Sequence, residues 1–536
     1  MAKVRIISDE KVGELIPDEA VVTISSSSGL GCPDATLSAI GAYFQKTGHP
    51  RRITTLHPIA AGDMYGVQGI DHLAHRGLLK RVIAGSLPSG PSSLPTPRIW
   101  QMIIDDEIEA YNLPSGIIFH MHREAAAGRP GVLSKVGIDT FVDPRRQGGR
   151  MNSATKEDIV QVVEFAGEEW LFFPSIIPNV AIIRGTTADE RGNISMEHEG
   201  AYLGALDQAL AARNGGGIVI AQVKRLAGRG SLKPQQVRVP GILVDYIVVD
   251  PQQKQTTQTE YDPAISGELF TAESSFSTIE WGLEKAIARR AAMELVRDDV
   301  VNLGFGISAL VPRVLLEEGL HNEVTWVIEQ GAVGGMPLLG FAFGCASNAD
   351  AILASPDQFT LFQGGGFDRS FLSFLQVDLE GSVNVSRLAA RPHVTAGVGG
   401  FIDITAQARA IVYCGFFTAG GLEQKMEDGR LKIGREGKNR KFVSAVEQVT
   451  FSGRRARAMN QEVTYVTERC VLKLLPEGLT VTEIAPGIDL KQDVLGQSEI
   501  PLRVSPELQL MDERIFRPGP LRLKLRQRAE TPDQPA

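Results

Sequence analysis

A weak internal repeat constrains the fold of this chain more than any other feature of its sequence. Residues 14–33 and 294–312 share one pattern: Glu-Leu, Ile or Val, any residue, Asp, then two valines, a loop of small residues and a proline. Each copy predicts the end of a helix, a turn, a buried strand, a glycine- or serine-rich loop and the start of the next helix. Two copies some 280 residues apart indicate that the chain contains related halves.

Two further pairs of segments repeat in the same order. Residues 189–194 match 378–383 in the pattern Asp-x-x-Gly, and residues 207–213 match 403–409 in the pattern Asp-x5-Arg before a predicted strand. Each match alone is at chance level, but three in one order indicate a duplicated α/β domain. Strands that alternate with helices favour βαβ crossovers. We therefore predict an α/β protein with two related domains, largely parallel sheets and an active site between the domains.

The length of 536 residues favours two or three domains. We predict an N-terminal α/β domain at 1–228 and a C-terminal one at 280–524. The intervening 229–279 is polar and rich in turn residues, and predicts a connection with one strand near 241–249. The last residues, 525–536, predict a disordered tail.

Composition narrows the possible partners and compartment. The chain is 43% apolar with a net charge of −8, so nothing in its overall charge favours a nucleic-acid partner. No stretch reaches the roughly 18 apolar residues of a membrane span, and the N-terminus is charged too early for a signal peptide. The four cysteines are far apart and form no Cys-x-x-Cys pair. These features predict reduced thiols and a cytoplasmic protein with no membrane partner.

The strongest candidate for chemistry is a carboxylate at the end of a predicted strand. The apolar run 324–328 ends on Glu329, and a glycine-rich turn follows at 331–335. Ligands of open α/β sheets lie beyond the carboxyl ends of strands, and a carboxylate there is able to act as a nucleophile. The equivalent position in the first half is near His57 and carries no carboxylate. A single catalytic group between two halves fits this asymmetry.

Three more glycine loops occur near this turn in the sequence. Gly304-Phe-Gly306 follows a predicted strand at 300–303, Gly364 to Gly366 follow a predicted strand at 359–362, and 397–400 precedes a predicted helix. Such loops supply backbone N–H groups that bind a phosphate or stabilise an oxyanion. The chain has no dinucleotide fingerprint, Walker sequence or Gly-x-Ser-x-Gly elbow. Two histidine pairs, 72/75 and 120/122, lack further ligands in the sequence, so we predict no metal site.

These features together resemble the family I CoA-transferases, and most closely the branch of acetate/propionate (short-chain acyl) CoA-transferases. The resemblance extends from about residue 3 to about residue 520. The segments that carry it are 71–82, 127–137, 184–194, 329–335, 364–366, 384–387, 399–405 and 418–421.

The resemblance implies a ping-pong transfer of CoA from an acyl-CoA to a small carboxylate. Glu329 would form an acyl–glutamyl anhydride and then a glutamyl-CoA thioester, with the Gly399 and Gly400 amides as the oxyanion hole. Coenzyme A would be the substrate and covalent carrier, with no tightly bound cofactor and no metal. The family's assembly implies a homodimer or homotetramer. The residues expected to bind substrate or CoA are Ser27, Gly29, Gly304, Gly306, Gln330, Gly331, Gly334, Gly364, Gly365 and Gly366.

The chain also departs from the family pattern. The serine-rich loop 25–34, the segment 84–90 and Gln363, where relatives often carry an aspartate, are all different. We therefore expect an acyl group or acceptor more polar or larger than acetate. Two alternatives stay open: an acyl-CoA hydrolase that uses the same glutamate, and a non-catalytic or sugar-phosphate-binding protein on a related fold.

Overall fold

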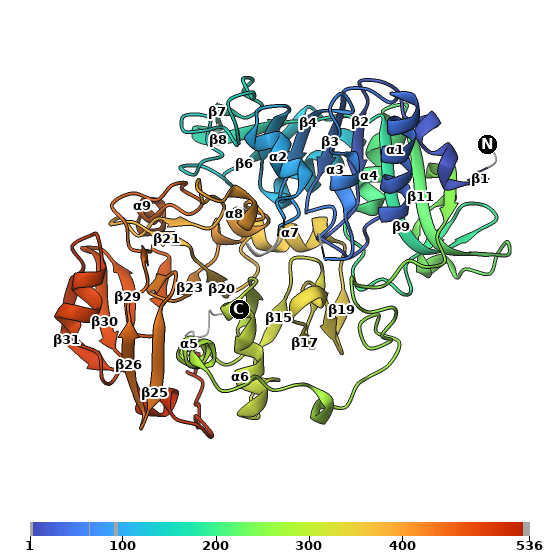
Figure 1. Ribbon diagram of the computed structural model, residues 1–536. Helices are drawn as coiled ribbons and strands as arrows, with labels where there is room; N and C mark the ends of the chain where they lie inside the picture. Colours follow the sequence, from blue (N-terminus) through green and yellow to red (C-terminus); the bar gives the residue numbers. More distant parts are fainter. Residues whose placement is uncertain (1–3, 64, 90–94, 529–536) are drawn as a thin grey trace.

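The computed structural model describes residues 4–63, 65–89 and 95–528. The chain forms two α/β halves, seen in Figure 1 as a blue-to-green part and a yellow-to-red part. A strand-rich extension, red in the figure, lies at the far end of the second half. Each half is built around its own large sheet, as the sequence predicts.

The main path of the first sheet contains eight strands, and every neighbouring pair along it is parallel. Two short strands, β10 (Ile194–Ser195) and β12 (Val237–Val239), join its side. Strand β13 comes from the predicted connection, so this part of 229–279 belongs to the first sheet. The order is β1 (Arg5–Ile7), β13 (Tyr246–Val249), β11 (Ile218–Ala227), β9 (Val180–Asp189), β2 (Val21–Ile24), β3 (Ile53–His57), β4 (Leu79–Ala84), β5 (Glu109–Asn112).

The second sheet repeats the centre of the first. Five of its strands are parallel neighbours in the order β15-β14-β20-β23-β28, which matches β3-β2-β9-β11-β13. Short or antiparallel strands extend it at both edges. The full order is β19 (Ala351–Ile352), β16 (Ala332–Val333), β15 (Thr325–Val327), β14 (Val300–Leu303), β20 (Arg369–Ser373), β23 (Ala410–Cys414), β28 (Glu462–Val466), β29 (Cys470–Leu475), β30 (Gly478–Ile484), β31 (Arg503–Leu510).

The repeated Asp-x-x-Gly segments adopt the same turn in both halves. The Asp189 carboxylate accepts hydrogen bonds from the N–H groups two and four residues later, and Asp378 does the same. Gly192 and Gly381 both take left-handed backbone angles, with φ of 81° and 80°, which glycine adopts at little cost. Sheet order and turn geometry together confirm the duplication predicted from the sequence.

Nine α-helices lie within the described residues, and one of them corrects a prediction. The segment 359–362 was predicted as a strand, but it lies in the helix α7, so Gly364 to Gly366 follow a helix. No helix in the described ranges is long and apolar enough to cross a membrane. The helices are α1 (Asp34–Thr47), α2 (Arg98–Ile104), α3 (Ser115–Ala126), α4 (Ala205–Asn214), α5 (Leu283–Ala292), α6 (Val311–Glu317), α7 (Ser355–Gln363), α8 (Phe401–Thr405) and α9 (Gly453–Ala458).

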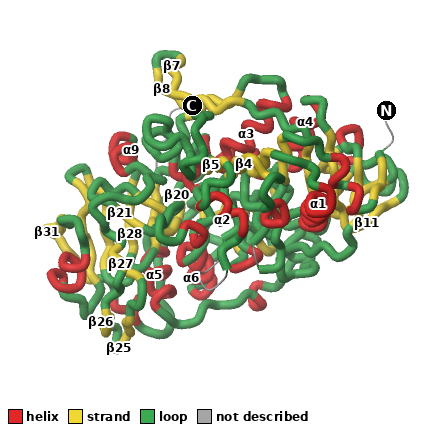
Figure 2. The backbone as a smooth tube through the Cα atoms, turned by 45° about the horizontal axis from the view of Figure 1, so that its top comes forward, coloured by secondary structure: helices red, strands yellow, loops and turns green. Residues whose placement is uncertain are grey.

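Each half also contains smaller sheets outside its large sheet. Figure 2 shows the hairpin β7–β8 projecting from the first half, and β25 with β26 at the end of the second. The remaining short strands pair locally or at the sheet edges. Two of the smaller sheets have longer strands. One contains β6 (Gly131–Ser134), β8 (Glu168–Pro174) and β7 (Gln161–Phe165), and the other pairs β25 (Glu423–Glu427) with β26 (Arg430–Arg435).

The two halves share one continuous apolar core where α3 meets α7 and α8. Phe119 of α3 packs against Phe359 of α7 with ring centroids 5.7 Å apart. His120 lies within 3.1 Å of the Thr360 hydroxyl, and the Gly116 N–H donates to the Asp403 carboxylate at 2.9 Å. The largest cluster of buried apolar residues contains side chains from both halves. The junction is therefore packed like a protein interior.

The end of the chain returns to the second half. Arg526 pairs with Glu294, and Arg528 pairs with Asp368. The first residues of the predicted disordered tail, 525–528, are therefore attached to the second half, because Arg526 and Arg528 form ion pairs with it. Residues 529–536 of that predicted tail lie outside the described residues.

Two phenylalanines test where the stability of the second half arises. Phe371 in β20 is fully buried, whereas Phe270 is 81% exposed. Phe371→Ala should lower the free energy of unfolding of that half by about 3–5 kcal/mol, because truncation leaves a cavity in a packed core. Phe270→Ala should change it by less than about 0.5 kcal/mol. Urea unfolding followed by circular dichroism measures both, and equal losses would contradict the assignment of the core.

Candidate active site

Glu329 lies just beyond the carboxyl end of β15, where a tight turn reverses the chain. The Ile328 N–H donates to Ala332 O, and the Gly331 N–H donates back to Ile328 O, both at 2.9 Å. Gly331 has a φ of 124°, and a Cβ at this position would collide with the Leu353 carbonyl oxygen. Only glycine fits both constraints. The turn therefore fixes the direction in which the Glu329 carboxylate leaves the strand.

The side chain of Gln330 joins this carboxylate to the first half. Its Nε2 donates to Glu329 Oε1 at 3.1 Å and to Ser27 Oγ at 3.2 Å. Gln330 is 3% exposed, and so is Ser27. The structure thus brings together Ser27, Glu329 and Gln330, three of the residues predicted from the sequence.

A glycine loop of the second half is held by the first half. The Asn112 side chain accepts from the Val398 N–H at 2.8 Å and donates to the carbonyl of Gly85 at 2.6 Å. The Gly399 N–H donates to Gly85 O at 2.7 Å, and Gly399 O accepts from the Ser115 N–H at 2.9 Å. These bonds cross between residues nearly 300 positions apart. The position of the loop therefore depends on the docking of the two halves.

Gly400 is the residue of this loop that meets the carboxylate. Its backbone N–H donates toward Glu329, and a Cβ at Gly400 would collide with Glu329 Oε2 and lie 2.8 Å from the Phe359 ring. Gly399 was also predicted as an oxyanion donor, but its N–H is occupied by Gly85 O. Gly400 is therefore the amide that faces Glu329, while Gly399 anchors the loop.

The surroundings of Glu329 oppose its negative charge. The residue keeps some solvent exposure, but dense protein around the carboxylate raises its pKa from 4.5 to about 7. Burial is the main cause, since a low-dielectric environment disfavours the ionised form. The hydrogen bonds from Gln330 and Gly400 act in the opposite direction. Near neutral pH the carboxylate is thus poised between its protonated and ionised forms.

Asp403 is a second carboxyl group at this site, and its part in the site was not predicted. Its Oδ2 accepts from the Gly116 N–H and its Oδ1 from Gln363 Nε2, both at 2.9 Å. The side chain is fully buried. Burial, with additional repulsion from Glu329, raises the pKa of Asp403 to about 8. Asp403 appeared in the sequence only as part of the repeat and of the segment 399–405, which marks the position without revealing its partners.

The other predicted glycines divide into two groups. Gly304 and Gly306 follow β14, the neighbour of β15, and so lie at the same edge of the sheet as Glu329. Gly334 shapes the turn after Glu329, where its N–H donates to Trp326 O. Gly29 lies in the loop of Ser27, against Asp63 and Thr257.

Gly364 to Gly366 lie at the opposite edge of the sheet. They follow the end of α7 and lead to Asp368, whose N–H donates to Val300 O at the amino end of β14. Gly364 and Gly365 line a polar hollow together with Gln407 and Arg409. The sequence-based prediction placed them beside Glu329 because it gave them a preceding strand, and the helix α7 removes that reason.

No cluster of three or more metal-ligating side chains occurs among the described residues. Of the histidines considered in the sequence, His122 is hydrogen-bonded by Thr23 and by the Ile118 carbonyl. Burial lowers the pKa of His122 to about 4, so it packs as a neutral side chain.

Comparisons with known proteins agree on one family. The family model described as coenzyme A transferase matches residues 7–250. The caffeate CoA-transferase of Acetobacterium woodii is 41% identical over 96% of this chain and 97% of its own. The acetate CoA-transferase YdiF of Escherichia coli K12 is 39% identical over 96% of this chain and 95% of its own.

Solved structures give the same result. The acyl-CoA transferase YdiF of E. coli O157:H7, in its apoenzyme form, superposes with a TM-score of 0.90 and 38% identity over 98% of both chains. The same protein in a thioester complex with CoA also has a TM-score of 0.90, with 37% identity and the same coverage.

The raised pKa of Glu329 predicts a pH-dependent effect on stability. A carboxyl group whose pKa is raised on folding destabilises the folded state progressively as pH rises from about 4.5 to about 7. Glu329→Gln removes this cost. We expect its melting temperature to exceed that of the natural protein clearly at pH 8 and only slightly at pH 5.

The exposed Glu477 provides a matched control. Glu477→Gln should show no such pH-dependent difference in scanning fluorimetry over the same range. A Glu329→Gln advantage that is larger at pH 5 than at pH 8 would contradict the raised pKa.

Proposed function

Because this chain belongs to the coenzyme A transferase family, we propose that it moves CoA from an acyl-CoA thioester to a free carboxylate with Glu329 as nucleophile. The observation that carries this proposal is the ionisable Glu329 carboxylate, held at the junction of the halves against the N–H of Gly400. The enzyme is a CoA-transferase, and the steps below are the mechanism proposed for it.

In the first half-reaction a Glu329 oxygen attacks the thioester carbonyl, the C–S bond breaks and CoA leaves as a thiolate. The product is an acyl–glutamyl anhydride. The thiolate then attacks the side-chain carbonyl of Glu329 and expels the acyl group as a free carboxylate. A glutamyl-CoA thioester remains, and an incoming carboxylate reverses both steps to leave as the new acyl-CoA.

The residues around Glu329 fit the demands of these steps. Each addition to a carbonyl creates an oxyanion, and one well-placed amide donor is worth about 3–4 kcal/mol in other enzymes. The Gly400 N–H is placed to supply it. Gln330 orients the nucleophile, and the edge formed by Gly304 and Gly306 is the proposed approach for the pantetheine end of CoA. The dense protein around the Glu329 carboxylate limits the access of water, which would hydrolyse either intermediate.

The acetate type of transferase is the proposed reaction class. It is supported by the similarity to the acetate CoA-transferase of E. coli, while the caffeate CoA-transferase of A. woodii is an equally similar relative. The proposal therefore includes both short-chain and aromatic carboxylates as acceptors. A homodimer or homotetramer and a cytoplasmic location stay predictions.

The covalent intermediate is the direct test. Intact-mass analysis after mixing the protein with acetyl-CoA, without acceptor, should show an adduct of the mass of CoA less water, which added acetate discharges. Glu329→Ala should form no adduct, and its kcat should fall by roughly 10³-fold or more, as expected for loss of a nucleophile.

The surface variant Glu477→Ala should behave as the natural protein does. If thiol release continues steadily without any acceptor, the protein is a hydrolase that uses the same glutamate. An adduct that persists in Glu329→Ala would refute the assignment of the nucleophile.

Gly400→Ala tests the amide beside the nucleophile. Gly400 has a φ of −85°, so alanine is compatible with the backbone, but its Cβ would collide with Glu329 Oε2. Displacing the carboxylate by even about 1 Å should lower kcat by roughly 100-fold. Gly434→Ala is the matched control, since its nearest neighbouring atom would be 3.6 Å from the new Cβ. Steady-state kinetics compares the two, and unchanged kcat in Gly400→Ala would contradict the proposed geometry.

A further inference from the structure

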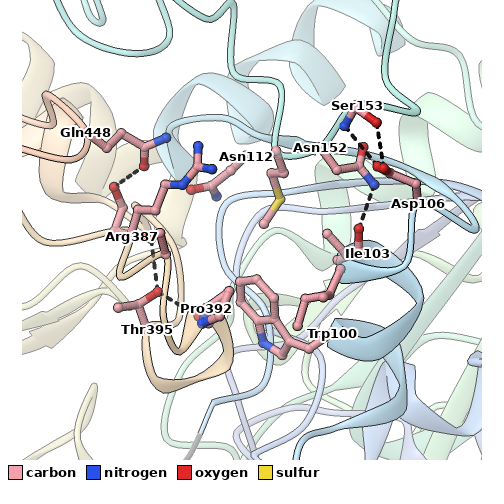
Figure 3. A pocket seen from close by; sticks show the side chains of 14 residues that line it. Trp100, Ile103, Asp106, Asn112, Asn152, Ser153, Arg387, Pro392, Thr395 and Gln448 are labelled. Atoms are coloured by element: carbon pink, nitrogen blue, oxygen red, sulfur yellow. Dashed lines mark hydrogen bonds between the residues drawn. The ribbon is translucent and has the colours of Figure 1, made fainter.

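A cavity lies between the two halves and is lined by Asn112, the residue that holds the catalytic loop. Its volume is about 270 Å³, close to the lower end of the range for small-molecule sites. The first half contributes α2 and the segment 151–153, and the second half contributes the loop 386–395. Figure 3 shows Trp100 and Arg387 reaching into this space from the two sides.

Most polar side chains of the cavity already have hydrogen-bonding partners within the protein. Asn152 donates to the carbonyls of Ile103 and Ile108, both at 2.9 Å. Gln448 accepts from Ser386 Oγ at 2.5 Å and donates to Gln147. These groups are fully occupied by the fold. A ligand therefore gains little from hydrogen bonds with them.

Asp106, at the far end of the cavity, is occupied in the same way. Its carboxylate accepts from the N–H groups of Ser153 and Ala154 at 2.9 and 3.0 Å, and from Ser153 Oγ at 2.5 Å. These bonds lower its pKa and keep it ionised. Its charge would repel a second negative charge on a ligand.

Arg387 is the exception among the lining groups. Its backbone is fixed, because its N–H donates to Asn384 Oδ1 and its carbonyl accepts from Asn384 Nδ2. Its guanidinium makes no hydrogen bond or ion pair with another described residue, and in Figure 3 it lies beside Asn112 with no dashed line. A guanidinium offers five N–H donors and binds carboxylates in a bidentate manner. Among the described residues that line the cavity, Arg387 is thus the one cation without a hydrogen-bonding or ion-pair partner.

The part of the wall that lies beside these occupied polar groups is apolar. Trp100 is 3% exposed, and its Nε1 donates to Pro88 O, so the indole offers carbon surface to the cavity. Ile103, Met151 and Pro392 add further apolar surface. One cation above an apolar wall matches a ligand with one carboxylate and an apolar body, whereas a phosphate or a dicarboxylate would find too few donors.

Asn112 connects this cavity to the catalytic loop. The same side chain lines the cavity and holds the Val398 N–H and the Gly85 carbonyl. Gly85 in turn holds Gly399, the neighbour of Gly400. A molecule in the cavity would therefore contact the wall that supports the glycine loop, without touching Glu329.

We propose that this cavity is a second binding site for a small organic monocarboxylate, with its carboxylate on Arg387 and its apolar body on Trp100. Free acids of this kind are the class that the transferase consumes and releases. That source of the ligand depends on the proposed function, but binding itself needs no turnover.

A heavy-atom probe locates the ligand directly. Crystals soaked in 4-bromobenzoate should show an anomalous bromine peak between Trp100 and Met151, with the carboxylate paired to Arg387. Neutral 4-bromobenzamide should give a peak at least about 10-fold weaker, because it lacks the charge that Arg387 binds. A bromine peak near Glu329 alone, or none, would overturn the proposal.

Two arginines of one loop provide matched variants. Arg387→Gln should lose the cavity peak, whereas Arg391→Gln should keep it, since Arg391 is exposed and does not line the cavity. Retention of the peak in Arg387→Gln would show that the cation does not hold the ligand and would refute the assignment. Glu329→Ala as the background separates the two proposals, because binding is then measured without turnover: a cavity peak that persists in this variant while the natural protein shows no CoA transfer would refute the proposed function and not the second site.

Discussion

The active site depends on keeping a negative charge on a carboxylate that its surroundings disfavour. Burial pushes the pKa of Glu329 up to about 7, and the two donors that oppose this, Gln330 and Gly400, belong to the second half but are positioned by the first. Gln330 is bonded to Ser27 of the first half. Gly400 belongs to the second half, but its loop is held by Asn112 and Gly85 of the first. Neither donor is therefore held in place by the second half alone.

This dependence explains why a duplicated fold needs only one catalytic carboxylate. His57 occupies the end of β3, the strand that corresponds to β15. It is fully buried, lies within hydrogen-bonding distance of Ile59 O and has a pKa lowered to about 4 by burial. The first copy thus carries a neutral side chain at the equivalent place. The first half instead holds Gln330 and the Gly400 loop in place, and so supports the charge of the second copy.

The sequence predicted the elements whose signals are local. The strand before Glu329, the glycine turn after it and the three repeated segments all appear in short windows, and the structure confirms them. The prediction at 359–362 was wrong because a short run of three apolar residues and Thr360 is equally compatible with a short buried strand and with part of a helix. Ser355-Pro356 at the N-terminus of α7 is a signal for a helix start, because proline is favoured in the first turn of a helix.

Other features of the site were beyond local patterns. The occupation of the Gly399 N–H by Gly85 and the pairing of Asp403 with Gly116 join residues nearly 300 positions apart. Such contacts follow from the docking of the halves, and no spacing in one sequence records them. The resemblance to a family marked the segment 399–405 as important, yet it did not distinguish the amide that faces Glu329 from the amide that anchors the loop.

Asp403 links the site's electrostatics to the proposed reaction. Gln363 Nε2 donates to its Oδ1, whereas an ionised aspartate at position 363 would have no N–H to offer and would add a further negative charge. With a pKa of about 8, Asp403 is largely protonated near neutral pH, which leaves the negative charge of the pair on Glu329. Conversion of Glu329 to an anhydride or thioester removes that charge. The repulsion that helps to raise the pKa of Asp403 then disappears, so this pKa must fall whenever an intermediate forms and rise again when the free carboxylate returns.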